Sequence, residues 1–516
     1  MHVPYLGEPR MTNRVRIPTR GDANREATDD LRSAGAHPGI RRPEIIQGGM
    51  GAGVSGWRLA RAVALAGQLG VVSGLGLDVI LTRHLQLGDP TGDYRRALAS
   101  FPFPAIADRI LGRYFVEGGI AADAPFRGID RLVVQPSRHS SQLAVAANFA
   151  EIFLAKEGHD GLVGVNHLEK TQMATPAAVY GAMLAGVDYV LMGAGVPAEI
   201  PNLLDAFATG RPGELTITVH GADAATTPPV SFSPQDVLDI ATDLPRPQFL
   251  AIVSSNMLAT YLSRESRTRP DGFVVEGIKA GGHSAPPRGP LTLDPEGQPA
   301  YGPRDVIELT KLCALGLPYW LAGGYASPGR LREAQAGGAT GVQVGSAFAL
   351  CAESGLQPSI RRALREKATI GTLRVHADPR ASPTGFPFKV AHLPGTLADE
   401  DVYAKRRRVC DIGYLRVPYR KDNGDVGYRC PAEPVGAFVR KGGDPDDAVG
   451  RRCLCNGLVA AIGLGQRRSD GTVEPSIVTI GHDLSFLPAL MRPGRDDYSA
   501  RQVVDYLING LEGTAV

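Results

Sequence analysis

The stretch WLAGGYASP at residues 320–328, together with GVQVGS at residues 341–346, is the most informative part of the sequence about its fold. Each is a short apolar run that ends in glycine, and the first continues into Ser327 and Pro328, a good N-cap and a good first helical residue. Backbone N–H groups at such a turn, with a helix N-terminus, form a site for a phosphate. Two such turns in succession are typical of the last two strands of a (β/α)₈ barrel.

Further short, continuously apolar runs precede these two, as expected for parallel strands that are buried on both faces. Helical patterns alternate with them, which favours repeated strand–helix units. The sequence therefore predicts an α/β fold, a closed TIM barrel. The expected strands are residues 44–47, 70–73, 162–166, 188–192, 249–253, 272–276, 318–322 and 341–344, and the expected helices are residues 56–67, 175–185, 304–314 and 330–336.

The spacing of these runs divides the chain into three parts. Residues 1–40 form a polar N-terminal extension, residues 41–355 the barrel, and residues 356–516 a C-terminal subdomain that contains cysteines. A long insertion after the second strand, about residues 76–160, includes a helical pattern at residues 148–156 and is expected to act as a lid or in substrate recognition. An extra strand is expected at residues 215–219.

Composition is that of an ordinary globular protein. The 516 residues carry a net charge of +2, which gives no reason to expect nucleic acid or a membrane surface as a partner. The N-terminus lacks the apolar core of a signal peptide, and the most apolar stretch, residues 179–196, is interrupted by Asp188 and four glycines. We expect a cytoplasmic enzyme and leave its oligomeric state open.

A glycine-rich stretch, QGGMGAGVSG at residues 47–56, follows the first strand. Gly51, Gly53 and Gly56 satisfy the dinucleotide-binding pattern G-x-G-x-x-G, and Asp78 lies at about the expected distance. However, Asp78 does not end a strand, and this alternative leaves the later glycine turns unexplained. We favour a second interpretation, in which glycines let a flat ring system approach the main chain closely.

Polar residues also stand where strands end. Asn166 ends the third strand, and a buried amide there costs free energy unless it meets a ligand or another polar group. His283 follows Gly281 and Gly282 after the sixth strand, at the expected mouth of the barrel. A lone histidine is commonly structural, but this position equally favours a catalytic or substrate-polarising role. His167 and Lys170 are expected on a solvated loop face, with lining the site as the alternative.

Taken together and in this order, the motifs resemble the nitronate monooxygenase family, which includes FMN-dependent enoyl reductases of fatty acid and polyketide synthesis. The resemblance covers roughly residues 42–353. It is carried by residues 47–51, 165–166, 190–197, 280–283, 322–324 and 341–346.

The resemblance implies one FMN in a TIM barrel. Its phosphate would rest on Gly323, Gly324, Gly345 and Ser346, and its isoalloxazine against Gly49, Met50 and Gly51, near Asn166 and Gly281–Gly282. A positive group near the ring would tune the flavin, and Lys279 is a weak candidate for it. His283 would be the catalytic residue.

The sequence departs from the family at one position. Nitronate monooxygenases are expected to place a catalytic histidine after the fourth strand, where this chain reads MGAGVP at residues 192–197. The reductase branch uses the Gly-Gly-His position instead, so we expect an enoyl-type acyl thioester to be reduced. Nitronate oxidation with O₂ is the alternative, and a barrel that binds a phosphorylated small molecule without redox chemistry is an alternative of another class. NAD(P)H as electron donor and an acyl carrier protein as partner stay open.

Six cysteines and one basic run complete the candidate features. Cys313 and Cys351 are expected in the core. Cys410, Cys430, Cys453 and Cys455 fall together in the C-terminal part, where they are either buried thiols or ligands of zinc or an iron–sulfur cluster. The basic run, residues 405–408, is expected to be a solvated face, with carrier-protein binding as the alternative.

Overall fold

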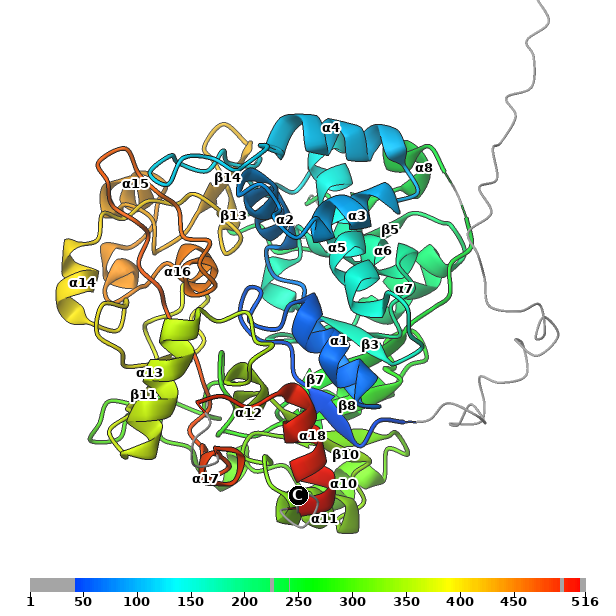
Figure 1. Ribbon diagram of the computed structural model, residues 1–516, viewed down its shortest axis with the longest axis vertical. Helices are drawn as coiled ribbons and strands as arrows, with labels where there is room; N and C mark the ends of the chain where they lie inside the picture. Colours follow the sequence, from blue (N-terminus) through cyan, green and yellow to red (C-terminus); the bar gives the residue numbers. More distant parts are fainter. Residues whose placement is uncertain (1–41, 223–226, 241, 492–495, 511–516) are drawn as a thin grey trace, which may run out of the picture.

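The computed structural model describes residues 42–222, 227–240, 242–491 and 496–510, so the expected extension at residues 1–40 lies outside the described residues (Figure 1). At its centre eight parallel strands close into a barrel in the order β1-β10-β9-β8-β7-β4-β3-β2. All eight expected strands and the TIM-barrel fold are confirmed. The strands are β1 (Ile45–Gln47), β2 (Leu69–Ser73), β3 (Val163–Leu168), β4 (Tyr189–Gly193), β7 (Gln248–Val253), β8 (Gly272–Glu276), β9 (Tyr319–Ala322) and β10 (Gly341–Val344).

The strands are apolar on both faces because each face packs against a core. Alternate side chains point into the barrel and form an interior cluster around Leu191, Leu250 and Trp320. The Trp320 indole N–H donates to the Pro43 carbonyl at 2.8 Å, so its one polar atom is satisfied. Side chains of the opposite register, such as Phe249, pack with the surrounding helices. This is the layered interior expected of a TIM barrel.

A helix follows each strand and covers the outside of the barrel. These helices are α1 (Trp57–Leu65), α5 (Arg138–Lys156), α6 (Thr175–Leu184), α7 (Ile200–Ala208), α9 (Asn256–Ser263), α10 (Leu309–Cys313), α11 (Pro328–Ala336) and α18 (Ala500–Asn509). The last, α18, packs against both α11 and α1 and so completes the ring. The helix α18 therefore belongs to the barrel, although it lies more than 150 residues after β10.

Two expected elements differ in extent. The helix expected at 304–314 is a 3₁₀ turn (Pro303–Asp305) followed by the short α10. Hydrogen bonds to neighbouring loops interrupt it, because Asp305 accepts from the Arg288 N–H and the Glu308 N–H donates to Asn256. The strand expected at 215–219 is mostly wrong, because only Leu215 lies in a strand, β5 (Gly213–Leu215). This strand pairs antiparallel with β6 (Val230–Phe232), and α8 (Pro234–Leu238) follows.

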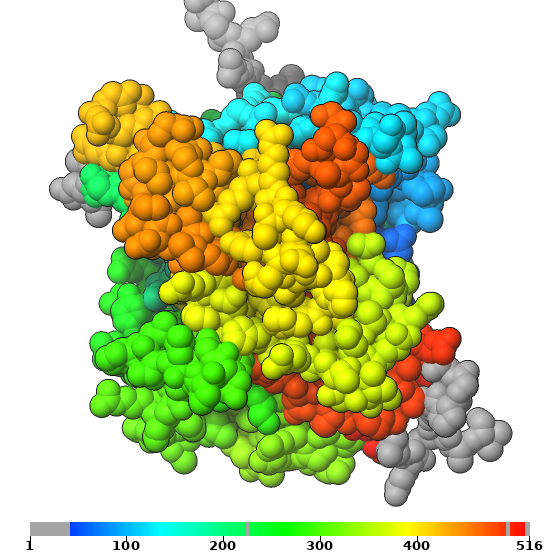
Figure 2. All heavy atoms as spheres, turned by 90° about the vertical axis from the view of Figure 1, so that its left-hand side faces the viewer, coloured from blue at the N-terminus to red at the C-terminus, as the bar shows by residue number. Residues whose placement is uncertain are grey.

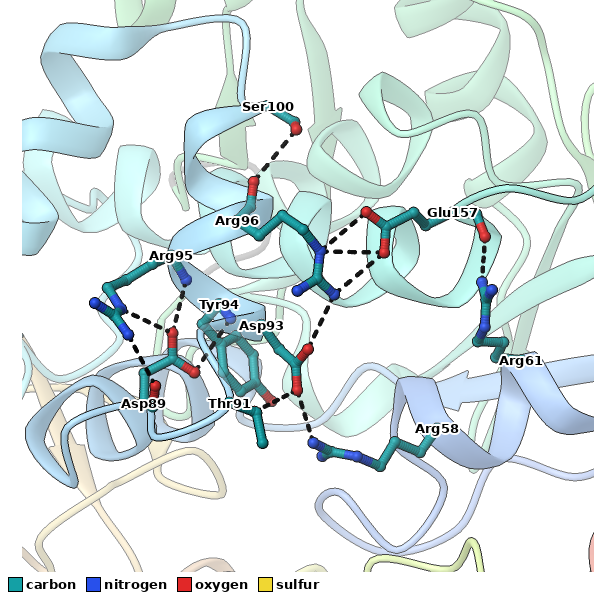
Figure 3. Close-up of polar contacts among 10 residues, drawn as sticks. All are labelled: Arg58, Arg61, Asp89, Thr91, Asp93, Tyr94, Arg95, Arg96, Ser100 and Glu157. Carbon is teal, nitrogen blue, oxygen red and sulfur yellow. Dashed lines mark hydrogen bonds and ion pairs between the residues drawn. The ribbon is translucent and has the colours of Figure 1, made fainter.

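The insertion after β2 contributes α2 (Leu77–Gln86), α3 (Asp93–Ala99) and α4 (Pro104–Tyr114). The expected helical pattern at 148–156 is the end of α5, which begins at Arg138 and packs against α1 and α6. Ion pairs fasten α3 to the barrel helices (Figure 3): Asp93 pairs with Arg58 of α1 at 2.8 Å, and Arg96 pairs with Glu157 at the end of α5 at 3.0 Å. Asp78 lies in α2, where Tyr414 donates to it, which together with the closed barrel excludes the dinucleotide-binding alternative.

The described residues between β10 and α18 form a cap that covers one face of the molecule, coloured from yellow-green through orange to red in Figure 2. Their side chains share one hydrophobic core with the barrel helices, for example Leu458 and Ile477. The elements of this cap are α12 (Ser346–Ala349), α13 (Pro358–Thr369), β11 (Val375–Asp378), β12 (Phe388–Ala391), α14 (Glu400–Lys405), β13 (Val417–Arg420), β14 (Val426–Arg429), α15 (Val435–Arg440), α16 (Leu454–Ala461) and α17 (Leu487–Leu490). Among the described helices, none is both long and apolar enough to cross a membrane.

Candidate functional site

A cavity lies at the carboxyl ends of the barrel strands, beneath the cap. The site residues expected from the sequence all line it, namely Gly49, Met50, Gly51, Asn166, Gly281, Gly282, His283, Gly323, Gly324, Gly345 and Ser346. The cap contributes further wall residues, among them Phe388, Leu454 and Thr479. The cavity is therefore enclosed by both the barrel and residues that lie far from it in the sequence.

The glycine turn after β9 is left-handed and closely packed. Gly323 and Gly324 both have φ of +89°, a conformation that favours glycine. A Cβ on Gly323 would lie 2.8 Å from the Gly277 carbonyl oxygen, so no larger side chain fits there without backbone movement. Lys279 also lines the cavity, and its Cδ would be 3.1 Å from a Cβ on Gly324. Lys279 therefore lies at the expected phosphate end of the cavity.

Two amide side chains in the cavity wall lack hydrogen-bond partners. Asn166 Oδ1 at the end of β3 and Gln343 Oε1 on β10 are buried and unpaired within the described part of the chain. A buried acceptor without a donor costs about 1–3 kcal/mol, so both oxygens call for a donor on a bound molecule. Next to Asn166, a Cβ on Gly49 would lie 2.5 Å from the Asn166 Cβ, which shows how closely main chain and amide approach.

His283 is held by the cap. Its backbone bridges to Phe388 of β12, and its ring packs edge-on against the Phe388 ring at a centroid distance of 4.9 Å. His283 Nε2 lies 2.7 Å from Ser382 Oγ, which in turn lies 2.8 Å from Thr384 Oγ1. Burial, assisted by the Lys170 charge, lowers the pKa of His283 to about 4. The imidazole is therefore neutral at physiological pH.

A carboxyl and an ammonium that the sequence analysis missed lie in the same region. Glu276 ends β8 and lines the cavity, and burial raises its pKa to about 7, against the lowering effect of Lys389. Lys389 of β12 is buried and donates to the Ile278 carbonyl, and burial lowers its pKa to about 8. Glu276 could have been found by the same signal as Asn166, a polar side chain at the carboxyl end of a buried strand. Lys389 carries no such signal, because the cap alone places it here.

The prediction that His167 lies on a solvated loop face after β3 is wrong. Its side chain is 3% exposed, and a Cβ on Gly74 would lie 2.4 Å from its ring, so it packs beneath the loop after β2. Burial lowers the pKa of His167 to about 4. Lys170 is exposed, and its ammonium pairs with Glu169 at 3.1 Å and lies over the Phe386 ring. Neither residue lines the cavity.

The basic run is also not a simple solvated face. Arg406 forms an ion pair with Glu474 at 2.6 Å, in which the two side chains are 6% and 1% exposed. Arg408 donates to Tyr403 Oη and to two main-chain carbonyls. Lys405 and Arg407 are exposed, so only half of the run faces solvent. The other two residues, Arg406 and Arg408, are held by the ion pair and the hydrogen bonds described above.

The burial of the cysteines differs in part from the expectation. Cys351 is buried, as expected, whereas Cys313 is exposed and lies 3.2 Å from Tyr319 Oη. Cys410, Cys430, Cys453 and Cys455 all line one small second cavity in the cap. Burial raises the pKa of each of these four thiols. Within the described ranges, no three or more His, Cys, Asp or Glu side chains are arranged to hold a metal ion, which argues against zinc.

Residues 248–379 match the family model "Nitronate monooxygenase". A nitronate monooxygenase of Pseudomonas aeruginosa is 41% identical over 130 residues, which cover 24% of this chain and 35% of that protein. The chain thus aligns with about a third of the length of this relative.

Solved structures give weaker similarities. FabK from Thermotoga maritima covers 91% of this chain and 93% of its own at 16% identity and a TM-score of 0.44. The enoyl reductase domain of MlnA from Bacillus amyloliquefaciens covers 91% and 94% at 11% identity and a TM-score of 0.43. At these scores neither similarity bears on function. The matched region runs from β7 to β11 and includes Glu276, His283 and the glycine turn after β9. Over this region the chain is similar to the nitronate monooxygenase family.

Proposed function

We propose that the protein is an FMN-dependent oxidoreductase that reduces the carbon–carbon double bond of an enoyl thioester. The choice of an enoyl thioester as substrate rests on one observation. Among the described residues that line the cavity, His283 is the sole histidine, and the end of β4 contributes Gly193 and Ala194 instead. The position at which nitronate monooxygenases are expected to hold their catalytic histidine therefore lacks an imidazole.

The residues present fit an FMN. Asn166 Oδ1 and Gln343 Oε1 are unpaired acceptors in the wall, as the edge of a flavin ring with its N–H group requires. Gly323, Gly324 and Gly345 leave main-chain N–H groups open to a phosphate, with Lys279 beside Gly324 as a counter-charge. When bound, FMN supplies hydride transfer.

The side chains around the cavity have separate roles in this proposal. His283 is neutral and anchored at Nε2 by Ser382, so it orients and polarises the thioester carbonyl as a hydrogen-bond partner. Glu276, whose pKa is raised to about 7 by burial, retains a proton near neutral pH and delivers it to the substrate carbon next to that carbonyl. Leu454, Leu458 and Phe388 of the cap exclude water from this end of the cavity.

The test uses the purified full-length protein. It is expected to be yellow, with one FMN released per chain on denaturation. After anaerobic chemical reduction, the flavin is expected to be reoxidised by a short enoyl thioester in free form. The same measurement with the thioester on an acyl carrier protein tests that partner. A colourless protein that cannot be reconstituted with FMN contradicts the whole proposal.

Nitronate oxidation is the second candidate, favoured by the match of residues 248–379 to the nitronate monooxygenase family. Under air, with an alkyl nitronate as substrate, it predicts oxygen consumption that depends on the nitronate. Such turnover without reoxidation by the enoyl thioester would reverse our choice of substrate while leaving the FMN site intact. The use of NAD(P)H stays a prediction, and adding it to the oxidised protein without air tests it directly.

A further inference from the structure

Four cysteines from three separate segments of the cap meet around one small cavity. Cys410 follows α14, Cys430 follows β14, and Cys453 and Cys455 lie at the start of α16. The elements α14, α15 and α16 lie close together in the fold (Figure 1). None of the four thiols takes part in a disulfide. The chain has only two other cysteines, Cys313 and Cys351. Their convergence is a property of the fold, because 45 residues separate the first from the last.

Main-chain N–H groups act on three of the four sulfurs. Burial raises the pKa of Cys430, Cys453 and Cys455, and the main-chain N–H groups of Ala432, Asn456 and Leu415 act in the opposite direction. Hydrogen bonds from N–H groups favour a thiolate over a neutral thiol, which is a weak acceptor. N–H groups directed at cysteine sulfur are also a main determinant of the properties of iron–sulfur clusters.

Both positive and negative side chains surround this cavity, and the carboxylate of Glu433 already forms an ion pair. Arg416 lines the cavity, and Arg131 and Arg416 both act electrostatically on Cys410. The Arg416 guanidinium is fixed by hydrogen bonds to the Leu132 and Gly413 carbonyls at 2.7 and 3.2 Å. Glu433 also lines the cavity, but Lys441 pairs with it at 2.6 Å. An anionic group bound by four thiolates would thus meet positive charge.

We propose that Cys410, Cys430, Cys453 and Cys455 are the ligands of an iron–sulfur cluster, of the four-iron type. Four cysteine thiolates are the usual ligands of such a cluster. A single zinc ion would need four sulfurs at about 2.3 Å from one point, and the described residues offer no such arrangement for a metal ion. A cluster of iron and sulfide is held by cysteine sulfurs placed around a central volume, and the four cysteines line one common cavity.

The cluster site borders the proposed flavin cavity. Cys455, Leu454 and Leu415 line both cavities, so a single layer of side chains lies between them. The inference itself does not depend on the proposed function, because it rests on the four thiols and the cavity that they line together.

The experiment uses the full-length protein, purified without air and then reconstituted with ferrous iron and sulfide. We expect about four iron and four sulfide per chain, and an electron paramagnetic resonance signal after reduction with dithionite. Zinc at one per chain without sulfide, or iron and sulfide no higher than in a protein lacking these cysteines, would overturn the inference. FMN content is measured on the same sample, so loss of the cluster and loss of flavin are scored separately.

Variants locate the site. Cys453→Ser and Cys430→Ser are each expected to lower bound iron at least fivefold. Cys351→Ser, a buried cysteine in the barrel core, and Cys313→Ser are the matched controls and are expected to keep the wild-type iron content. Circular dichroism verifies that the variants fold. Equal iron in all four folded variants would contradict the assignment.

Discussion

His283 of the barrel and Ser382 of the cap are joined by a hydrogen bond of 2.7 Å between Nε2 and Oγ. The two residues are 99 positions apart in the sequence. Ser382 Oγ lies in turn 2.8 Å from Thr384 Oγ1, so two hydroxyls of the cap hold the imidazole in place. The cap thus orients the histidine that the barrel presents.

Replacing either partner of this hydrogen bond is expected to slow reoxidation of the reduced flavin by an enoyl thioester. His283→Ala removes the polarising group, and we expect a loss of about 100-fold. Ser382→Ala removes only the anchor, worth about 1 kcal/mol, and we expect about fivefold. Ser100→Ala, in which an exposed hydroxyl is lost, is the control. Equal rates for Ser382→Ala and wild type would show that the anchor is dispensable.

Glu276 is expected to set the pH dependence of the same reaction. Its raised pKa of about 7 means that the carboxyl is protonated below that pH and loses its proton above it. If Glu276 donates the proton, the rate falls as pH rises through 7, whereas His283, with a pKa of about 4, causes no change between pH 5 and 9. Glu276→Gln should abolish this step in the stopped-flow profile. Lys389→Met, which removes the cation that lowers the pKa of Glu276, should move the step to higher pH.

His167 predicts an acid-sensitive fold. Burial lowers its pKa to about 4 in the folded state, against about 6.5 in an unfolded chain, so the unfolded state binds more protons between these values. The stability is complete above pH 6.5 and falls as pH decreases towards 4, by up to about 1.4 kcal/mol per unit. Urea midpoints at pH 7.5 and 5 measure this loss. His167→Gln should reduce the difference between the two midpoints, and an unchanged difference would assign the effect to other groups.

Gly345→Ala tests the proposed phosphate end of the cavity. A Cβ at this position meets only the Met50 side chain, with its sulfur at an ordinary contact distance of 3.5 Å, so the fold should tolerate it. The added methyl group occupies part of the cavity wall, and we expect FMN affinity to fall at least tenfold by fluorescence titration. Gly329→Ala is the control, because its Cβ would meet nothing within 4 Å and the residue does not line the cavity. Equal affinities would place the phosphate elsewhere.

Asp93 holds the insertion to the barrel (Figure 3). Burial alone would raise its pKa, but hydrogen bonds from Thr91 and Arg96 and the charge of Arg58 lower it. Asp93→Asn is therefore expected to cost about 1–2 kcal/mol at pH 7. The cost should vanish as the wild-type carboxyl becomes protonated at low pH. Glu333→Gln, which breaks an exposed pair with Arg330, should cost less than about 0.5 kcal/mol in the same thermal unfolding experiment.

The barrel could be predicted from the sequence because its determinants are local. Continuous apolar runs form strands that are buried on both faces, and glycine or a polar residue at their carboxyl ends marks the mouth of the barrel. That rule placed Asn166, His283 and the glycines of the cavity wall, which do line one cavity. It would also have found Glu276, which was overlooked.

Only the tertiary structure decided the rest, because these features depend on contacts between distant segments. Hydropathy did not show that His167 packs under the loop after β2, or that Arg406 turns inward to Glu474. No local pattern returns α18 to the barrel, brings Ser382 to His283 or places the Lys389 charge near Glu276. The sequence determined a barrel with a glycine-lined mouth, and the packing of the cap decided which charges, hydroxyls and thiols surround it.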